Sequence, residues 1–430
     1  MKKHLFFFII AISLLVMSSH VRGQGVDLRS VVAVVRVNNC ESSKTFLKEY
    51  GAMLRKDGYT EGADWIESYI EGGFGSGFTY QDPVTKKYYI ITNRHVVAFS
   101  ENVTVEFVEK DKSVVKYEQC PVVAIHDEMD IAIVALPDSV QRSSLLFSQQ
   151  VLKEGVDVFT AGYPGLGGYP SWQFGMGIIS NARFYSPIFA DYKDIPLIQH
   201  TAQADAGSSG GPLLVKSPES QNSYLVVGIN TWKIHAIENA NFSIPAQHAM
   251  DLIHEFTNTT VELSDEQLLA RANQFVSALD DYKKITPFIS FEYLSEIKPR
   301  DFYDWYNASP KDVKEEIAKM FNESPIDAVR TALAYAIHSK VAGKNLKVVD
   351  VDGHTVNMLY DNKAVTSQWV KEQGKLRVKT FSFFNPKTDA KSGIIKNFGG
   401  KSFVSFGVSR GFATDPNLMF NFSYENTYLY

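Results

Sequence analysis

The sequence has few cysteines, little net charge and no apolar run long enough to cross a membrane. Two cysteines among 430 residues exclude a disulfide-rich scaffold. A net charge of −5 leaves no excess of positive charge to attract nucleic acid or an anionic membrane. With 45% hydrophobic and 21% charged residues, the composition is that of a globular chain with about two or three domains.

Residues 1–23 are predicted to be a signal peptide. Lys2 and Lys3 precede the apolar run 5–17, and a short polar stretch leads to a cleavage position near Gly23. A membrane anchor is the alternative, but this run is shorter than the ~20 residues that a helix needs to span a bilayer. We therefore expect an exported protein, periplasmic or secreted, with no stable membrane span once the signal is removed.

The two cysteines are Cys40 and Cys120. An oxidising compartment would allow a disulfide between them, and two buried thiols are the alternative.

Short β-branched runs separated by turn residues dominate residues 28–258 and predict an antiparallel all-β barrel or sandwich. The pattern changes within residues 42–69, where apolar residues such as Phe46, Tyr50 and Trp65 recur at helical spacing. We expect one or two short helices inserted between strands there, forming a surface elaboration of the β domain.

Beyond this region the pattern changes to α and then to β, so an α+β region is predicted. Residues 263–342 form a helical segment, with Ser264 and Gln267 as a capping box for its first helix. Residues 345–430 form a β-rich module in which Asp352-Gly353 and Gln373-Gly374 mark hairpins. Its strands are expected at 346–351, 354–360, 365–371, 375–384, 403–409 and 418–424. Its many phenylalanines fit a β core better than a ligand-binding face.

The glycine-rich stretch 204–212 (ADAGSSGGP) places the Ser209 hydroxyl among residues with almost no side chain. A serine alcohol attacks a carbonyl only when a base takes its proton and nearby donors stabilise the oxyanion. His95 and Asp130 precede it, each at the end of a strand or in a loop. The order His95, Asp130, Ser209 is one of those known for serine triads. Alone, the glycine-rich stretch fits a plain hairpin loop as well as a nucleophile loop, and a lone histidine or aspartate is more often a core histidine or a turn carboxylate.

The local motifs resemble those of trypsin-like serine proteases. Residues 91–97 (ITNRHVV), 130–134 (DIAIV) and 207–212 (GSSGGP) resemble the histidine, aspartate and nucleophile motifs of that family. The likeness is strongest to the protease domain of the HtrA-like branch, and it extends over about half the chain. Further matching motifs follow one another in the same order as in that family, at 75–78 (GSGF), 161–164 (AGYP), 177–180 (GIIS), 228–231 (GINT) and 242–245 (FSIP).

The resemblance implies a double β-barrel with the triad in the cleft between the barrels. His95 would act as general base and then general acid, Asp130 would orient it, and Ser209 would form the acyl-enzyme. The backbone N–H groups of Gly207 and Ser209 would form the oxyanion hole. Neither a metal nor an organic cofactor is implied. The glycine-hydrophobic loop of the PDZ domains that often follow HtrA-like proteases is not recognisable in residues 345–430.

Substrate-binding residues are also implied by the resemblance. Gln203 matches the floor of the primary specificity pocket and carries no charge, which does not support a trypsin-like demand for Lys or Arg. Thr231, Trp232 and Lys233 would pair with the substrate backbone, and Asn241 stands where a pocket-wall glycine is common. A bulky wall favours small or medium P1 side chains, whereas Lys233 could attract an acidic one. His200 and Asp205 are interpreted as a strand histidine and a turn carboxylate.

The sequence therefore predicts an exported serine endopeptidase that acts on polypeptides, with no prediction of its oligomeric state. The alternative is a weakly active or inactive protease-fold scaffold that works through its C-terminal module. A serine esterase is disfavoured because its nucleophile elbow lies between a strand and a helix, whereas a strand is expected after Ser209.

Overall fold

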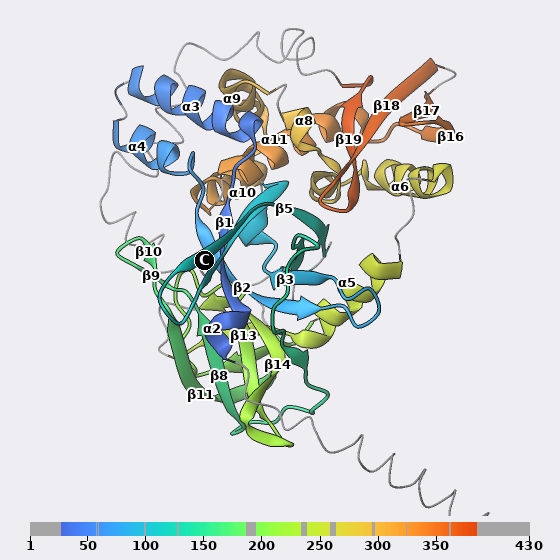
Figure 1. Ribbon diagram of the computed structural model, residues 1–430. Helices are drawn as coiled ribbons and strands as arrows, with labels where there is room; N and C mark the ends of the chain where they lie inside the picture. Colours follow the sequence, from blue (N-terminus) through green and yellow to red (C-terminus); the bar gives the residue numbers. More distant parts are fainter. Residues whose placement is uncertain are drawn as a thin grey trace, which may run out of the picture.

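The computed structural model describes residues 27–384, except 57, 59, 99, 127–128, 186–194, 234–238, 259–263, 295–296, 324 and 361–362. The expected signal peptide and the strands expected at 403–409 and 418–424 lie outside the described residues. In Figure 1 the β-barrels occupy the lower part of the molecule, and a mixed unit of helices and a small sheet lies above them.

The first barrel is closed, with strand order β1-β2-β3-β6-β5-β4. Its core faces carry β-branched and aromatic residues, which suit a pleated, buried surface. Strand β3, for example, is buried along its whole length. The short helix α2 (Leu28–Val31) leads into it. The strands are β1 (Val32–Val37), β2 (Phe74–Gln81), β3 (Tyr88–Thr92), β4 (Asn102–Val108), β5 (Val114–Ile125) and β6 (Ala132–Ala135).

The second barrel follows the order β13-β8-β11-β12-β15-β14, and pairing of β13 with β14 closes it. Strand β7 (Leu146–Phe147) extends it beside β14, β9 (Gly165–Leu166) and β10 (Tyr169–Pro170) form a small hairpin, and helix α5 (Ala246–Asn258) follows the last strand. The predicted double β-barrel is confirmed. The barrel strands are β8 (Asp157–Gly162), β11 (Gln173–Phe184), β12 (Leu197–His200), β13 (Pro212–Ser217), β14 (Ser220–Lys233) and β15 (Asn241–Pro245).

The upper unit combines helices with an antiparallel sheet of order β16-β17-β18-β19. Ser264 caps its first helix as predicted, because its hydroxyl accepts a hydrogen bond from the Gln267 N–H at 3.2 Å. The sheet strands are β16 (Leu346–Asp352), β17 (Thr355–Tyr360), β18 (Lys363–Glu372) and β19 (Lys375–Phe381). The helices are α6 (Asp265–Ala278), α7 (Tyr282–Ile285), η3 (Thr286–Phe288), α8 (Phe291–Leu294), α9 (Pro299–Ala308), α10 (Lys311–Glu323) and α11 (Pro325–Val341).

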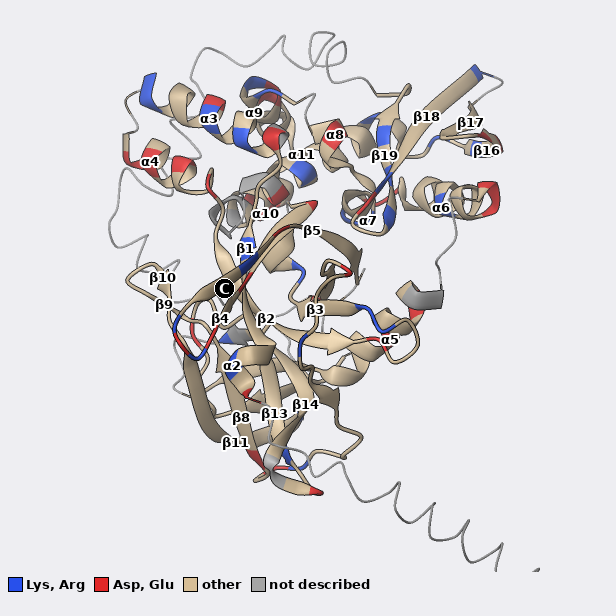
Figure 2. Cartoon of the chain, in the orientation of Figure 1, with Lys and Arg blue, Asp and Glu red and all other residues tan. Residues whose placement is uncertain are grey.

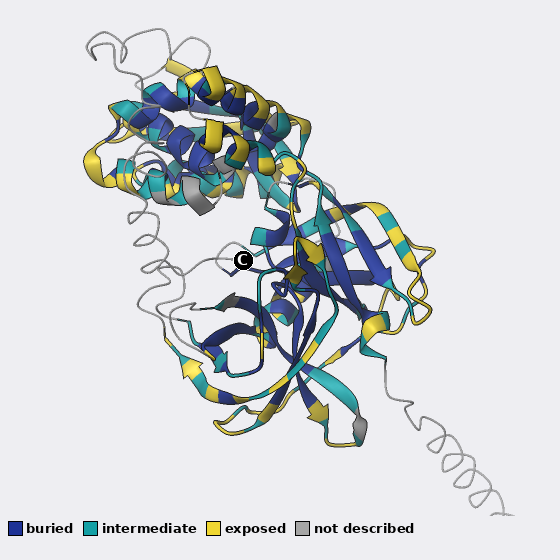
Figure 3. Ribbon diagram, turned by 90° about the vertical axis from the view of Figure 1, so that its left-hand side faces the viewer, coloured by how far each residue is buried: buried dark blue, intermediate teal, exposed yellow. Residues whose placement is uncertain are grey.

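The helical segment and the β-rich module share one hydrophobic core, which Figure 3 shows as the buried interior of the upper unit. The Phe275 ring of α6 lies 5.8 Å from the Trp369 ring and 5.4 Å from the Phe381 ring, both in the sheet. Phe381 and Phe384 are each 2% exposed. For these phenylalanines, packing in a core accounts for the aromatic content better than a ligand-binding face.

The inserted helices α3 (Glu41–Lys56) and α4 (Thr60–Ser68) belong to this same core. Figure 1 shows α3 beside α9, although the two are far apart in the sequence. The Phe302 ring of α9 meets the rings of Phe46 and Tyr50 edge-on, at 6.3 and 6.1 Å. The expectation of a surface elaboration is wrong, because the apolar face of α3 is covered by the C-terminal helices.

The outer sides of these helices carry charges of both signs, interspersed along α3 and α9 (Figure 2). Arg55 near the end of α3 forms ion pairs of 2.6 Å with Asp64 and with Glu67 on α4. These exposed pairs orient one helix on the other but contribute little stability compared with the buried rings.

Cys40 and Cys120 are not joined in this structure, which favours the alternative of two separate thiols over a disulfide. Cys40 packs beside the upper core, with its Sγ 3.1 Å from the Ser43 hydroxyl. Cys120 lies in the first barrel and donates to the Tyr117 carbonyl at 3.2 Å. Burial raises the pKa of the Cys120 thiol to about 11, so it stays protonated at neutral pH.

The shared core makes a stability prediction for Phe302. Replacing Phe302 with Ala should lower the free energy of unfolding by roughly 3–5 kcal/mol, because a buried ring is lost and a cavity remains. Because Phe302 contacts Phe46, the double substitution Phe46→Ala/Phe302→Ala should show a coupling of about 0.5–1.5 kcal/mol. Urea unfolding followed by tryptophan fluorescence measures both values.

The matched control is Leu359→Ala, at a β17 side chain that is 41% exposed, which should change stability by less than about 0.5 kcal/mol. Strict additivity of the Phe46 and Phe302 effects would contradict the packing of α3 against α9.

Candidate active site

The pairing of two strands brings His95 to Asp130. Strand β3 runs antiparallel to β6 with Thr92 opposite Ala132, so the residues just after β3 lie beside those just before β6. His95 begins the short 3₁₀ turn η1 (His95–Val97). Its Nδ1 lies 2.6 Å from Asp130 Oδ2, and its backbone N–H donates to Asp130 Oδ1 at 2.8 Å. The carboxylate therefore holds both the ring and the main chain of the histidine.

Asp130 is buried and has partners on several sides. Thr231 Oγ1 donates to its Oδ2 at 2.7 Å, and the Asn93 amide donates to its backbone carbonyl at 2.7 Å. Burial alone would raise the pKa of this carboxyl group, but the charge of His95, its hydrogen bonds and Arg94 outweigh burial and lower the pKa to about 2. Asp130 therefore stays ionised at neutral pH, so a positive charge on the His95 imidazole would be stabilised.

The loop that carries Ser209 depends on two glycines with backbone conformations that side chains rarely adopt. Gly207 has φ +93° and Gly210 has φ +86°. A Cβ on Gly207 would lie 2.7 Å from the Tyr163 carbonyl oxygen, and one on Gly210 would lie 2.2 Å from that of Ser76. Both distances are shorter than a van der Waals contact, so any larger residue would displace the loop.

Ser76 of the first barrel holds this loop in place. Its N–H donates to the Ser209 carbonyl at 2.8 Å, and its hydroxyl donates to the Gly207 carbonyl at 2.6 Å. From the sequence, Ser76 was recognised only as part of the supporting motif at 75–78, and no role was assigned to it. With both carbonyls bound to Ser76, the N–H groups of Gly207 and Ser209 make no hydrogen bond to any residue within the described ranges.

The Ser209 hydroxyl makes no hydrogen bond to the histidine in this structure. It donates to the Thr231 carbonyl at a long 3.4 Å, and among the described residues His95 Nε2 has no hydrogen-bond partner. The two motifs are nonetheless adjacent: a Cβ on Gly75 would lie 2.6 Å from Val96 and 3.1 Å from the Ser209 carbonyl oxygen. Hydrogen bonds between nucleophile and base are often long without substrate and shorten when it binds.

Two of the residues assigned to substrate binding, Gln203 and Lys233, meet at Asp205. Lys233 Nζ lies 2.6 Å from Asp205 Oδ1, and the Gln203 amide donates to Oδ2 at 2.9 Å. Asn241 is 3% exposed and donates to the Ala202 carbonyl at 3.0 Å. The Lys233 charge is thus compensated within the protein, which removes the reason to expect attraction of an acidic P1 side chain. Asp205, interpreted from the sequence as a turn carboxylate, is the partner of this lysine.

The backbone of Trp232 pairs with that of Phe242 across β14 and β15, and its side chain lies outside what the structure describes.

His200 is a strand histidine, as predicted, and takes no part in the His95 pair. It is fully buried in β12 with its Nε2 3.0 Å from the Ser243 hydroxyl, which in turn donates to Asn230 Oδ1 at 3.0 Å. Burial lowers the pKa of His200 to about 4, so this ring stays neutral. No group of three or more His, Cys, Asp or Glu side chains within the described ranges is arranged to hold a metal ion.

Residues 75–220, which contain His95, Asp130 and Ser209, match the family model of the trypsin-like peptidase domain. The chain contains a trypsin-like peptidase domain. Serine protease Rv3671c of Mycobacterium tuberculosis is 35% identical to it over 130 residues, which are 29% of this chain and 30% of that protein. The serine protease Do-like HtrA of Bacillus subtilis is 30% identical over 190 residues, 43% of this chain and 39% of the relative. The resemblance to HtrA-like proteases predicted from the motifs is confirmed.

The match is partial on both sides. The chain spans 30% of Rv3671c and 53% of the serine protease Do-like HtrA of Lactobacillus helveticus, to which it is 26% identical. The crystal structure of the active form of Rv3671c aligns with 55% of this chain and 85% of that chain, at 22% identity and a TM-score of 0.38. The upper unit of helices and sheet lies beyond the residues that the family model matches.

Because His200 is kept neutral by burial, the stability of the peptidase domain should depend on pH. Between pH 6.5 and about 4 the unfolded chain binds a proton at this histidine and the folded protein does not. The free energy of unfolding should therefore fall, by about 3 kcal/mol, as the pH is lowered through this window. Urea unfolding at a series of pH values measures the slope.

In His200→Gln this contribution to the slope should disappear, whereas His354→Gln, at an exposed turn position of the upper unit, should keep it. Equal slopes in wild type and His200→Gln would contradict the assignment.

Proposed function

We propose that this protein is an exported serine endopeptidase that hydrolyses peptide bonds through His95, Asp130 and Ser209. The observation that carries the proposal is the geometry of the His95 ring. Its Nδ1 is bound to an ionised Asp130, and its Nε2 has no partner among the described residues. Because Asp130 accepts a hydrogen bond from the Nδ1–H group, Nε2 is the basic nitrogen of the imidazole.

The chemistry follows from these positions. When substrate binds, the Ser209 hydroxyl turns from the Thr231 carbonyl toward His95 Nε2, which takes its proton while Oγ attacks the carbonyl carbon. The N–H groups of Gly207 and Ser209 bind the oxyanion of the tetrahedral intermediate. His95 then gives the proton to the leaving amine, and a water molecule repeats the sequence on the acyl-enzyme. Asp130 stabilises the imidazolium without taking a proton itself.

For the substrate we propose a polypeptide with an uncharged, small or medium P1 side chain. The pocket residues Gln203 and Asn241 are neutral amides, and the charges of Lys233 and Asp205 compensate each other at 2.6 Å. The backbone of residues 231–233 would pair with the substrate main chain.

Export is supported by the amino-terminal sequence, with its short basic and apolar segments within residues 1–23. Within the part of the chain that the structure describes, no helix has the length and apolar character to cross a membrane. A probable periplasmic serine endoprotease DegP-like of Hahella chejuensis, 28% identical over 188 residues, is among the relatives. A periplasmic or secreted location fits these observations.

One observation favours a second function, that of a scaffold with a protease fold and little turnover. The Ser209 hydroxyl bonds to the Thr231 carbonyl at 3.4 Å instead of to His95. In that case the upper unit would carry the biological activity, and Ser209→Ala would leave it unchanged.

Labelling with a fluorophosphonate distinguishes the two functions. The folded wild-type protein should be labelled at Ser209, as mass spectrometry of peptides would show. Ser209→Ala should lose both labelling and peptide hydrolysis, and His95→Ala should lower kcat by a comparable factor of roughly 10⁶. Ser180→Ala, at an exposed serine of β11, is the matched control and should behave as wild type. A folded wild-type protein that takes no label would support the scaffold.

Cleavage of a peptide library tests the specificity pocket. Two single substitutions should shift the P1 preference in opposite directions. Wild type should prefer uncharged P1 residues. Lys233→Gln leaves the Asp205 carboxylate without its cation and should raise relative kcat/KM for Lys and Arg at P1 by about tenfold, equal to about 1.4 kcal/mol. Asp205→Asn frees the Lys233 ammonium and should favour Glu and Asp to a similar extent. A wild-type preference for acidic P1 residues would contradict the role given to the ion pair.

A further inference from the structure

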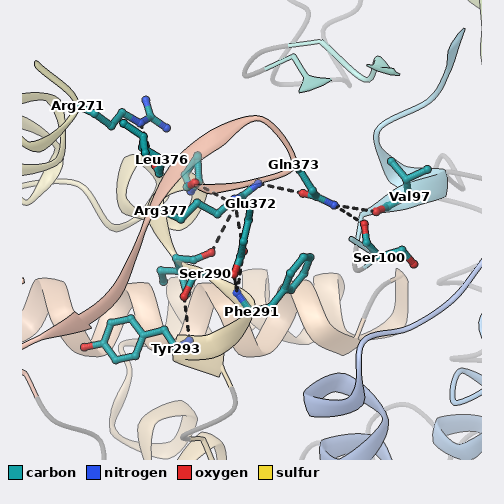
Figure 4. Close-up of polar contacts among 12 residues, drawn as sticks. Val97, Ser100, Arg271, Ser290, Phe291, Tyr293, Glu372, Gln373, Leu376 and Arg377 are labelled. Atoms are coloured by element: carbon teal, nitrogen blue, oxygen red, sulfur yellow. Dashed lines mark hydrogen bonds and ion pairs between the residues drawn. The ribbon is translucent and has the colours of Figure 1, made fainter. Parts of the chain in front are cut away.

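The turn between β18 and β19, residues 372–375, reaches from the upper unit into the first barrel. We call these residues the hairpin tip. Gln373 is 5% exposed, and its side-chain Nε2 donates to two backbone carbonyls of the barrel, those of Val97 at 3.0 Å and Ser100 at 2.9 Å (Figure 4). A carboxamide buried between two main-chain carbonyls is a specific contact, because each would lose a hydrogen bond without it.

These carbonyls belong to the segment that carries His95. Val97 is the last residue of the 3₁₀ turn that begins at His95, and this turn has only three residues. The Val97 carbonyl accepts one hydrogen bond from within its own segment, from the Ser100 N–H at 3.1 Å, and Gln373 supplies a second one from the upper unit. Asp130 holds the turn at its beginning through the His95 N–H, and Gln373 holds it at its end.

The hairpin tip also touches the strand that leads to Asp130. Gly374 has φ +74°, and a Cβ there would lie 2.2 Å from the Val123 carbonyl oxygen of β5. Strand β5 ends at Ile125 and precedes the loop that contains Asp130. The hairpin tip therefore contacts the backbone that follows His95 and the backbone of the strand that leads to Asp130.

The tip is held rigidly within the upper unit. Arg377 is 2% exposed and donates to Gln373 Oε1 at 3.1 Å and to the Pro287 carbonyl at 3.1 Å. Since Arg377 can only donate, Gln373 must present its oxygen to Arg377 and its nitrogen to the barrel. Glu372 accepts the Phe291 N–H at 2.8 Å, which ties the tip to helix α8. Figure 4 shows this continuous chain of contacts from α8 to Ser100.

We propose that Gln373 is a positioning residue, through which the upper unit holds the His95 turn in the geometry needed for catalysis. This inference rests on the proposed protease function, because it concerns the same histidine. Full activity of the peptidase domain then requires the docked hairpin tip, and the upper unit is part of the catalytic apparatus rather than an independent module.

Gln373→Ala and Gly374→Ala test this in two different ways. The first removes the donor to Val97 and Ser100, and the second pushes the tip away from Val123 while keeping the Gln373 amide. In each we expect kcat to fall at least about tenfold with KM changed by less than about twofold, since a misplacement of ~1 Å at a catalytic group can cost ~10²-fold. Activity is expressed per folded protein, determined by circular dichroism and urea unfolding, so a loss of folded protein is not mistaken for a loss of kcat.

Two matched controls separate docking from local damage. Gln368→Ala removes an exposed glutamine from the same strand. Gly353→Ala imposes a comparable backbone strain, with φ +58°, at a turn where no atom lies within 4 Å of the added Cβ. Both should keep wild-type kcat. If Gln373→Ala does not fold, the kcat of Gly374→Ala compared with that of Gly353→Ala tests whether docking of the hairpin tip is required.

A spectroscopic readout makes the test independent of turnover. The low-field proton resonance of the hydrogen bond between His95 Nδ1 and Asp130 should shift or broaden in Gln373→Ala and Gly374→Ala and stay unchanged in both controls. Wild-type kcat and an unchanged resonance in the folded tip variants would overturn the proposal. If the resonance changes in the tip variants but the wild-type protein hydrolyses nothing, the protease function is rejected and the positioning role of Gln373 is kept.

Discussion

The candidate site depends first on the register between β3 and β6. These two buried strands pair with Thr92 opposite Ala132, and this places His95 beside Asp130 at 2.6 Å. A slip of one residue would turn every side chain of a strand to its other face and would separate the pair. The apolar faces of both strands fill the barrel core, so such a slip would also expose them to water. The stability of the first barrel and the geometry of the His95 pair therefore have the same origin.

The second half of the site is held by contacts between the barrels. The loop around Ser209 lies between β12 and β13, but its carbonyls are bound by Ser76 of the first barrel. Two glycines with positive φ allow this close approach of main chain to main chain. Thr231 then joins the halves, since its hydroxyl binds Asp130 and its carbonyl accepts from Ser209. The candidate catalytic groups are thus fixed in part by residues of the opposite barrel.

The upper unit is assembled from two distant parts of the chain. The inserted helices leave the first barrel after β1 and return before β2, where the Val37 N–H donates to the Gly73 carbonyl at 3.0 Å. Their apolar face is covered by helices formed more than two hundred residues later in the chain. The hairpin tip then returns from this unit to the His95 turn. Physically, the chain is therefore two units that exchange segments rather than a series of independent domains.

Local patterns in the amino-acid sequence by themselves determined much of this protein. Three kinds of signal depend only on neighbours in the sequence: β-branched runs, capping residues and the motifs around His95, Asp130 and Ser209. The strands, several helices and the motif residues could therefore be predicted. The tertiary structure alone decided the partner of α3, the ion pair of Lys233 with Asp205, the role of Ser76 and the contact of Gln373 with the His95 turn. Each of these joins segments far apart in the chain, and burial and hydrogen-bond geometry select such partners without leaving a periodic signal in the sequence.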